Sequence, residues 1–415
     1  MSRVTVLPKN IPIKNIENDI RPIAITCPIS KVAEHFISKF FDEHFDERQD
    51  ENQFGSTRGL STTLALIKLS HVLFEASDDS RNIIRVLFID FKRAFDLIDH
   101  NILHKKLTEY GFASQLSTWM LSFLVDRKQF VRIGNCVSDV VVTNAGAPQG
   151  TRAGPNDFKV LINDLSFESP YVKYVTVAAT STNPLDNNMQ LEVDKLVEWC
   201  VDNRMRLNTS KTKEMIIYFG KTYPKSEIAC TVINEARIER VETFKLLGII
   251  FSSDLTWRAH IEYMLAKASK RIFVVYQLVR AGISVNDVLS VYCSLIRSIL
   301  EYACPVWHCG LTKGQSEEIE GVQRRCMRVL FPELSYSDSL QITGLELLCT
   351  RRERLVYNLF SEIKNKGHVL NNLLPAKIID ECNCATRDSY PYRMPRARTE
   401  RPLRSFISYC VRKRF

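Results

Sequence analysis

The chain has 415 residues, of which 45% are hydrophobic and 25% charged, and its formal net charge is +9. These values exclude a long disordered or low-complexity protein and predict an ordered chain of two or three domains. No run of eighteen apolar residues occurs, and the N-terminal stretch lacks the apolar core of a signal peptide, so we expect neither a membrane span nor secretion. The twelve cysteines are scattered, which favours reduced thiols in an intracellular protein. A zinc site at His308 and Cys309 is the alternative.

The N-terminal half predicts a mixture of helices and strands. A helix is expected over 22–47, because Val32, Ala33, Phe36, Ile37, Phe40 and Phe41 recur at spacings of three and four. The apolar run over 85–90 predicts a buried strand, and the alternating run over 129–142 predicts a hairpin around Gly134-Asn135. Further helices are expected at 62–75, 94–107, 117–124, 155–165 and 191–204, and further strands at 172–177 and 213–219.

The C-terminal half predicts mainly helices. After F-K-L-L-G-I-I-F (244–251) the apolar spacing becomes helical over 258–281, 285–300 and 315–330, so we place a boundary near residue 255. The last eighty residues read as mixed, with an extended Pro-rich end. From 385 to 415 there are nine Lys or Arg residues against two acids, with Tyr390, Tyr392, Phe406 and Tyr409 between them. Such a segment suits a phosphate backbone and stacked bases, and a solvated basic tail is the alternative.

Two short stretches carry the candidate chemistry. Asp90 follows the buried strand in F-I-D-F-K-R-A-F-D (88–96), where a carboxylate could bind Mg²⁺ or cap the next helix. A second stretch, A-P-Q-G-T-R-A-G-P (147–155), has glycines that allow a ligand to approach the backbone and an amide at Gln149. Neither stretch is specific by itself.

Seven motifs in one order are specific together. In addition to the two above, they are R-P-I-A-I-T (21–26), N-Q-F-G with R-G-L-S-T-T (52–63), L-N-T-S-K-T-K (207–213), F-K-L-L-G (244–248) and E-Y-A-C-P-V-W-H (301–308). The series resembles the reverse transcriptases of non-LTR, LINE-like retrotransposons over nearly the whole chain. The endonuclease found upstream in such elements has no counterpart here, so we expect a fragment or the product of a truncated copy.

The resemblance implies an α/β (α+β) right-hand polymerase fold. Fingers would occupy 1–84, the palm with part of the fingers 85–255, a helical thumb 256–330, and a C-terminal region with the basic tail 331–415. An RNA-directed DNA polymerase of this kind would bind an RNA template and a DNA primer and use two Mg²⁺ ions. It would work in the cytoplasm or nucleus, in the ribonucleoprotein of a mobile element. The sequence does not specify the template or an oligomeric state.

The resemblance also assigns roles to particular residues. Asp90 would be the first catalytic, Mg²⁺-binding aspartate, and Lys211 would lie near the triphosphate as a proton donor. Phe95 would exclude a 2′-hydroxyl, Gln149 and Gly150 would line the nucleotide pocket, and Arg21 and Arg58 would bind phosphates. For the lysine and the phenylalanine, a surface position and core packing are the respective alternatives. The charge of the tail, and not the resemblance, predicts that nucleic acid contacts its arginines, namely Arg393, Arg396, Arg398, Arg401 and Arg404.

One motif departs from the family in a way that affects the chemistry. The family has two aspartates after an aromatic and a small or apolar residue, whereas here Tyr174-Val175 is followed by Thr176 and Val177. Replacement by Asp164 or Asp186 is disfavoured from their sequence context. Ser56-Thr57 and Arg152-Ala153 also depart from the family pattern. Substitution of the acid pair and in-frame deletion of about three residues are both open.

Three hypotheses follow from these observations. The first is a polymerase by descent, inactive or severely impaired because the acid pair is missing. The second is a non-catalytic nucleic-acid-binding remnant that uses the thumb, the stretch R-R-C-M-R (324–328) and the basic tail. The third is a decayed element without function.

Overall fold

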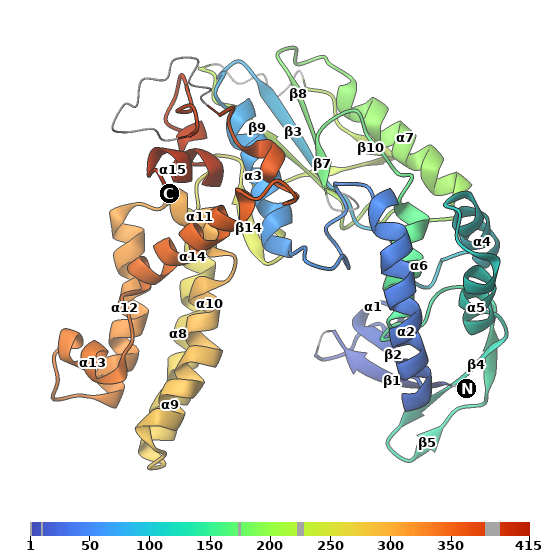
Figure 1. Cartoon of the computed structure of the whole chain (residues 1–415), viewed down its shortest axis with the longest axis horizontal. Helices are drawn as coiled ribbons and strands as arrows, with labels where there is room; N and C mark the ends of the chain where they lie inside the picture. Colours follow the sequence, from blue (N-terminus) through green and yellow to red (C-terminus); the bar gives the residue numbers. More distant parts are fainter. Residues whose placement is uncertain (1, 10, 173–175, 222–227, 378–390) are drawn as a thin grey trace.

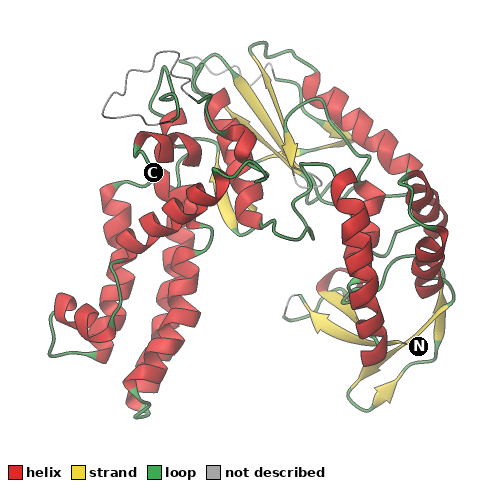
Figure 2. Cartoon of the chain, in the orientation of Figure 1, coloured by secondary structure: helices red, strands yellow, loops and turns green. Residues whose placement is uncertain are grey.

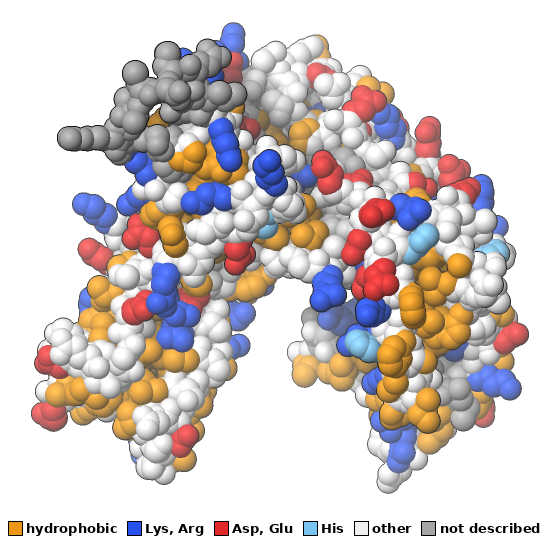
Figure 3. Space-filling view, viewed as in Figure 1, with side chains coloured by type: hydrophobic (Ala, Val, Ile, Leu, Met, Phe, Trp, Pro, Cys, Tyr) orange, Lys and Arg blue, Asp and Glu red, His pale blue; other side chains and the backbone are white. Residues whose placement is uncertain are grey.

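The structure, a computed structural model, describes residues 2–9, 11–172, 176–221, 228–377 and 391–415. Two arms are joined at one end by a β-sheet, and an open hollow separates them (Figure 1; Figure 3). One arm combines strands with helices, whereas the other is built from helices (Figure 2). The predicted α/β class is confirmed, and so is the change to helices near residue 255, because every named element after β14 (Ile249–Ser252) is helical in the described ranges.

The sheet at the junction positions the candidate site. Its strand order is β12-β9-β3-β8-β7. The bounds are Ile83–Phe88 for β3, Tyr171–Val172 for β7, Thr176–Ser181 for β8, Lys213–Ile217 for β9 and Glu239–Arg240 for β12. The central strand β3 pairs antiparallel with both β8 and β9, and all six of its residues are buried. Because successive side chains of a strand point to opposite faces, Val86 enters one hydrophobic core and Leu87 the other.

Helices cover both faces of this sheet. The core on the Leu87 side includes residues of α2 (Pro28–Phe45), α4 (His100–Glu109), α5 (Ser114–Leu124), α6 (Ala153–Ile162) and α7 (Asn188–Asp202). On the other side, α3 (Thr62–Ala76) packs against the sheet and contacts α11 (Cys304–Trp307) and α15 (Phe406–Arg412). One core therefore continues from the sheet into the helical arm.

A second sheet lies in the arm that contains the N-terminus. It consists of β1 (Ser2–Pro8), β2 (Ile20–Ile25), β4 (Arg127–Ile133), β5 (Cys136–Val137) and β6 (Val141–Thr143), and the short helix α1 (Ile16–Asp19) precedes β2. β1 pairs antiparallel with β2 and parallel with β4. This arm therefore combines the start of the chain with a hairpin more than a hundred residues later, and the hairpin turns at Gly134-Asn135 as predicted.

The helical arm matches the predicted helices closely. It contains α8 (Arg258–Arg280), α9 (Val285–Tyr292), a π-helical turn (Cys293–Arg297), α10 (Ser298–Glu301) and α12 (Lys313–Leu330). The hairpin of β13 (Thr243–Leu246) and β14 leads into it, after the small hairpin of β10 (Val232–Ile233) and β11 (Ala236–Arg237). α12 begins with a capping box between Thr312 and Gln315. No helix in the described part of the chain combines the length and apolarity that crossing a membrane requires.

Two predicted helices begin later than expected. The helix predicted from residue 22 begins at Pro28, because Ile20–Ile25 pairs with β1 as strand β2. The helix predicted from residue 94 begins at His100, where the Asp99 side chain accepts hydrogen bonds from two backbone N–H groups of the first turn. In both cases a strand pairing or a capping contact makes the helix begin later than the apolar spacing indicates.

The prediction of an extended Pro-rich end was wrong for its last residues, because 391–401 contains no helix but 402–412 does. The region contains α13 (Tyr336–Thr343), α14 (Leu348–Ile363), two 3₁₀ turns (Asn371–Leu373 and Pro402–Arg404) and α15. α15 contacts α14, α11 and α3, and buries Phe406, Ile407, Cys410 and Val411. The many basic residues obscured the apolar spacing of an amphipathic helix, and the apolar face of this helix packs into the core.

Candidate functional site

The register of β3 and β9 brings Asp90 and Lys211 together. Phe88 lies opposite Lys213 in this antiparallel pair, so Asp90, two residues after Phe88, approaches Lys211, two residues before Lys213. The Asp90 Oδ2 and Lys211 Nζ atoms are 4.0 Å apart, and the Asp90 side chain is 43% exposed. The Asp90 N–H donates to the Thr212 hydroxyl at 3.3 Å, and the Asn208 N–H donates to the Asp90 carbonyl at 2.8 Å. The turn before β9 therefore fixes the backbone of Asp90 and leaves its carboxylate accessible.

The neighbouring hairpin has no acid to add to Asp90. Thr176 and Val177 belong to β8, where they pair with Phe88 and Leu87 of β3. Both are buried, and the Thr176 hydroxyl has no hydrogen-bond partner in the described part of the chain. Tyr174 and Val175 lie outside the described residues. In sequence, residues 171–182 contain neither Asp nor Glu.

The A-P-Q-G loop is held against two other segments. The Ala147 N–H donates to the Phe95 carbonyl at 2.8 Å, and the Gln149 side-chain amide donates to the Asp96 carboxylate at 3.2 Å. On its other side the Ala24 N–H of β2 donates to the Gln149 carbonyl at 2.8 Å. The loop thus joins the turn after Asp90 to the N-terminal sheet.

Glycine is required at two points of this loop. Gly146 has φ of 74°, and a Cβ there would lie 2.7 Å from the carbonyl oxygen of Asp96. Gly150 has φ of 101°, and a Cβ there would lie 3.0 Å from the Ile23 side chain. Both positions combine a left-handed backbone with a close approach, so a larger residue would displace the loop.

The remaining predicted pocket residues are spread out. Phe95 is half-buried, with its ring centroid 5.3 Å from that of Phe158 on α6. Arg21 is exposed on β2, and Arg58 is exposed near Asp46. Burial raises the pKa of Asp46 overall, although the Arg58 charge lowers it. The structure therefore brings together two pairs, Asp90 with Lys211 and Phe95 with the Gln149 loop, and shows no contact of either arginine with them among the described residues.

The acids considered as replacements have other partners. Asp164 accepts hydrogen bonds from the Lys106 ammonium at 2.7 Å and from the Trp199 indole N–H at 2.9 Å. Asp186 accepts hydrogen bonds from the backbone and side chain of Asn188 at the start of α7. Within the described ranges, no group of three or more His, Cys, Asp or Glu side chains is arranged to hold a metal ion.

Sequence reasoning missed a buried acid pair beneath the A-P-Q-G loop. Glu34 of α2 accepts a hydrogen bond from the Arg152 N–H at 2.7 Å, and Asp157 lies on α6 behind it. Burial raises the pKa of Asp157 well above its usual value, the Glu34 charge raises it further, and Arg127 lowers it. Both Asp157 carboxylate oxygens lack a hydrogen-bond partner in the described structure. No local signal was available, because Asn156 and Lys159 are polar neighbours of Asp157 in α6.

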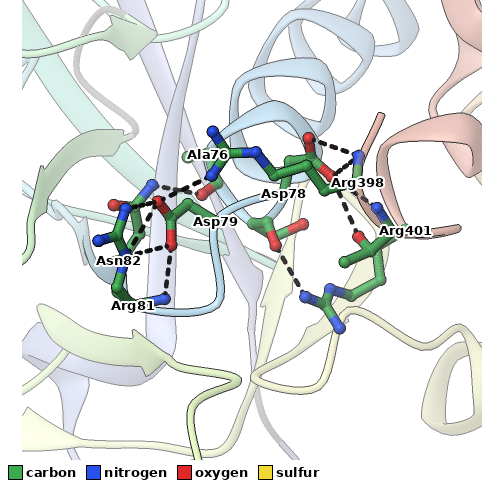
Figure 4. Close-up of polar contacts among 9 residues, drawn as sticks. Ala76, Asp78, Asp79, Arg81, Asn82, Arg398 and Arg401 are labelled. Carbon is green, nitrogen blue, oxygen red and sulfur yellow. Dashed lines mark hydrogen bonds and ion pairs between the residues drawn. The ribbon is translucent and has the colours of Figure 1, made fainter. Parts of the chain in front are cut away.

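Two tail arginines, Arg398 and Arg401, contact the residues that follow α3 (Figure 4). The N–H groups of Arg398 and Thr399 donate to the Asp78 carboxylate, and the Arg398 guanidinium lies 3.4 Å from Asp79. The Arg401 guanidinium donates to the Ser77 carbonyl at 2.9 Å and stacks 3.9 Å from the centroid of Phe219. The side chains of Arg393, Arg396, Arg398 and Arg404 are exposed.

The prediction that aromatic residues of the tail stack on bases is wrong for two of them. Tyr392 and Phe406 are 4% and 1% exposed, and both rings pack edge-on against Phe360 of α14. These rings stabilise the C-terminal region itself and cannot stack on bases without unfolding it. Tyr390 lies outside the described residues.

The fold and this site define a right-hand polymerase domain, with an acid just after the central strand β3 and a lysine opposite it. The chain belongs to the reverse transcriptase (RNA-dependent DNA polymerase) family, which it matches over residues 8–251. The motif order in the sequence predicted this family, and the match confirms it.

Curated relatives come from non-LTR retrotransposons, as the motifs indicated. The chain is 24% identical over 329 residues to a probable RNA-directed DNA polymerase from transposon BS of Drosophila melanogaster, covering 75% of this chain and 36% of that protein. It is 24% identical over 327 residues to the corresponding protein from transposon X-element of the same fly, covering 75% and 35%. It is also 25% identical over 240 residues to the RNA-directed DNA polymerase from mobile element jockey of Drosophila funebris, covering 53% and 25%. The chain therefore spans about a third of the length of the first two relatives.

Among solved structures, the chain resembles telomerase from Candida tropicalis in complex with a TWJ fragment of telomeric RNA. The TM-score is 0.43 at 10% identity, covering 88% of this chain and 57% of that one. The apo telomerase of the same yeast gives a TM-score of 0.39 at 9% identity, covering 62% and 54%.

Proposed function

We propose that this reverse transcriptase domain descends from an RNA-directed DNA polymerase and still binds nucleic acid, but polymerises little or not at all. The observation that carries the proposal is the pairing of β8 with β3. It puts Thr176 and Val177 in the buried strand beside Phe88 and Leu87, next to Asp90, in a hairpin whose sequence contains no acid.

The residues at this centre do not fit a pair of Mg²⁺ ions. Mg²⁺ needs several oxygen ligands in octahedral geometry, and two ions need carboxylates that converge on both. Asp90 offers one carboxylate, which already lies 4.0 Å from the Lys211 ammonium, and its backbone carbonyl accepts from Asn208. Loss of the metal contribution, several kcal/mol at about 1.4 kcal/mol per tenfold in rate, would slow polymerisation on the order of a thousandfold or more.

An in-frame deletion explains the missing acids better than substitution. Substitution would leave Thr176 and Val177 at the tip of the hairpin. Instead they pair with Val172 and Tyr171 within the antiparallel pair of β7 and β8. Because the β-branched pair lies inside β8, a shortened connection accounts for its position.

This interpretation predicts that activity returns by insertion and not by replacement. Two aspartates inserted between Val175 and Thr176 should produce primer extension on an RNA template with Mg²⁺ or Mn²⁺, at least tenfold above the unmodified chain. The matched control inserts two asparagines, and Asp90→Ala in the aspartate-inserted chain should abolish the gain. Replacement by Thr176→Asp and Val177→Asp should instead reduce the folded yield, because both positions are buried.

Primer extension by the unmodified chain that disappears with Asp90→Ala would refute the proposed loss of activity. An insertion that adds no extension to an unmodified chain without activity would leave the loss in place and refute the deletion route.

The binding part of the proposal rests on exposed arginines. Arg393, Arg396 and Arg404 of the tail and Arg324, Arg325 and Arg328 of α12 are exposed. In filter binding of a single-stranded RNA, the logarithm of the binding constant should fall linearly with the logarithm of salt concentration. Each phosphate contact that is removed should reduce this slope by about 0.7. Alanine at Arg393, Arg396 and Arg404 is a sharper test than deletion of the tail, because deletion removes buried core residues. An unchanged slope in that triple variant would exclude the tail from the binding surface.

The expected partners follow from the same proposal. They are an RNA template and a DNA primer in a ribonucleoprotein of a mobile element, in the cytoplasm or nucleus. Co-purification of the tagged chain with RNA that nuclease treatment removes would support this, and a chain free of nucleic acid at low salt would contradict it.

A further inference from the structure

Helix α2 exposes an apolar stripe that the fold leaves uncovered. Ile29, Val32, Phe36 and Phe40 are 79%, 58%, 60% and 61% exposed, and their spacing of three and four places them on one face of the helix. Hydrophobic side chains gather over α2 on the face of the arm that is turned to the viewer (Figure 3). Single exposed apolar residues are ordinary, but four large ones in one line mark an interaction surface.

The opposite face of α2 already supplies the core contacts of the helix. Phe41 and Phe45 are 1% and 0% exposed, and both rings pack against Phe112. The periodic apolar residues of 22–47 therefore belong to two faces and not to one. A helix that is apolar on two faces is expected where it lies between two partners.

A basic ridge runs beside the stripe. Lys31, His35 and Lys39 are exposed and follow one another at intervals of four, so they form one row along the helix. The Arg152 guanidinium lies 2.8 Å from the His35 ring nitrogen and extends the ridge. The first turn of α2 contains no acid, and Lys31 lies near the helix end where the helix dipole disfavours a cation. Lys39 is paired with Glu43 at 3.9 Å, so helix stability explains Lys39 but not Lys31 at the start of the row.

We propose that the stripe and ridge of α2 bind an amphipathic helix of another protein segment. Such a helix has apolar residues at i, i+3 or i+4, and i+7 and acidic residues along one flank, which match the stripe and the ridge. The proposal is independent of whether the polymerase centre is active.

An acidic helix complements the ridge better than a second copy of this chain does. In an antiparallel pair of α2 helices the ridge would face the same row, in which Glu43, one turn after Lys39, is the one acid. In a parallel pair it would face the other flank of α2, which carries Ser30 and Ile37 and no acid.

The test uses two labelled synthetic peptides of eighteen residues and the full chain. Both peptides carry leucines at heptad a and d positions, and one has glutamates and the other lysines on the flank. Fluorescence anisotropy at low salt should give at least tenfold tighter binding for the glutamate peptide. Phe36→Ser with Phe40→Ser should weaken it at least tenfold, and Lys31→Glu with Lys39→Glu should reverse the preference between the peptides.

Phe273→Ser is the matched control, because Phe273 is 64% exposed on α8, in the other arm. It should leave binding unchanged, and all variants should melt like the parent chain because the changed side chains are exposed. Equal affinity for the two peptides, or equal weakening by the control, would overturn the proposal. So would sedimentation showing a dimer that Phe36→Ser dissociates, or flotation with phosphatidylserine vesicles that depends on Phe36.

Discussion

Helix α2 near the N-terminus and helix α15 at the C-terminus differ in burial in the opposite sense to what their sequences suggest. α2 carries a dense apolar pattern that predicts a core helix, yet four of its large apolar side chains are more than half exposed. α15 lies in a basic tail that predicts solvent exposure, yet Phe406, Ile407, Cys410 and Val411 are at most 1% exposed. The number of apolar residues in a segment therefore does not reveal how much of it the rest of the fold covers.

The difference comes from what each helix can reach. The residues before α15 are held to the end of α3 through Asp78 and Ser77, and the apolar face of α15 then packs against the core that α3 and α14 share. α2 lies at the edge of the other arm, where α6 and residues 110–112 occupy one side and no described element covers the other. Chain connectivity and position decide burial, and both are tertiary properties.

The largest expected effect separates the two helices directly. Phe406→Ala should destabilise the chain by about 3–5 kcal/mol, because it opens a cavity in a fully buried site. Phe36→Ala, the same chemical change on α2, should stay within about 0.5 kcal/mol. Thermal melting of the two variants side by side measures the contrast. Similar losses in both would mean that α2 is covered on its outer face.

A smaller effect concerns the buried face of α2. Burial and the Glu34 charge raise the pKa of Asp157. At neutral pH, folding therefore either protonates this carboxyl or buries its charge, and both cost free energy relative to the ionised group in water. The contribution of Asp157 to stability is fully present below its pKa in the unfolded chain and is lost as pH rises towards its pKa in the folded chain. Asp157→Asn should therefore raise the melting temperature by a few degrees at pH 7 and by little near pH 4. A gain that is equal at both pH values would contradict this origin.

The smallest effect concerns the docking of the tail. Asp78→Ala removes the acceptor of two backbone N–H groups and should cost about 1 kcal/mol at pH 7. Burial alone would raise the Asp78 pKa, but these hydrogen bonds and the Arg398 charge lower it overall. The stabilisation is therefore present above the unfolded pKa and is lost as pH falls through the folded pKa. Asp139→Ala, at an exposed position, is the control, and an equal melting shift in both would show that the docking contacts contribute nothing.

Sequence motifs identified some residues of the candidate site and missed others. Asp90, Lys211, Phe95 and Gln149 were identified from motifs, and the register of β3 and β9 explains why residues far apart in sequence meet. Asp96 as the partner of Gln149, and Glu34 with Asp157 beneath the loop, could not be predicted, since no local pattern indicates which polar side chains a fold brings into contact.

The sequence by itself determined the family, the α/β class, the order of most elements and the absence of acids from residues 171–182, because motifs and apolar periodicity are local properties of the chain. Only the tertiary structure decided that Thr176 and Val177 lie inside a buried strand, that the basic tail closes onto α3, and that α2 presents an apolar stripe. These features depend on which strands and helices become neighbours, and that choice is made by packing over the whole chain.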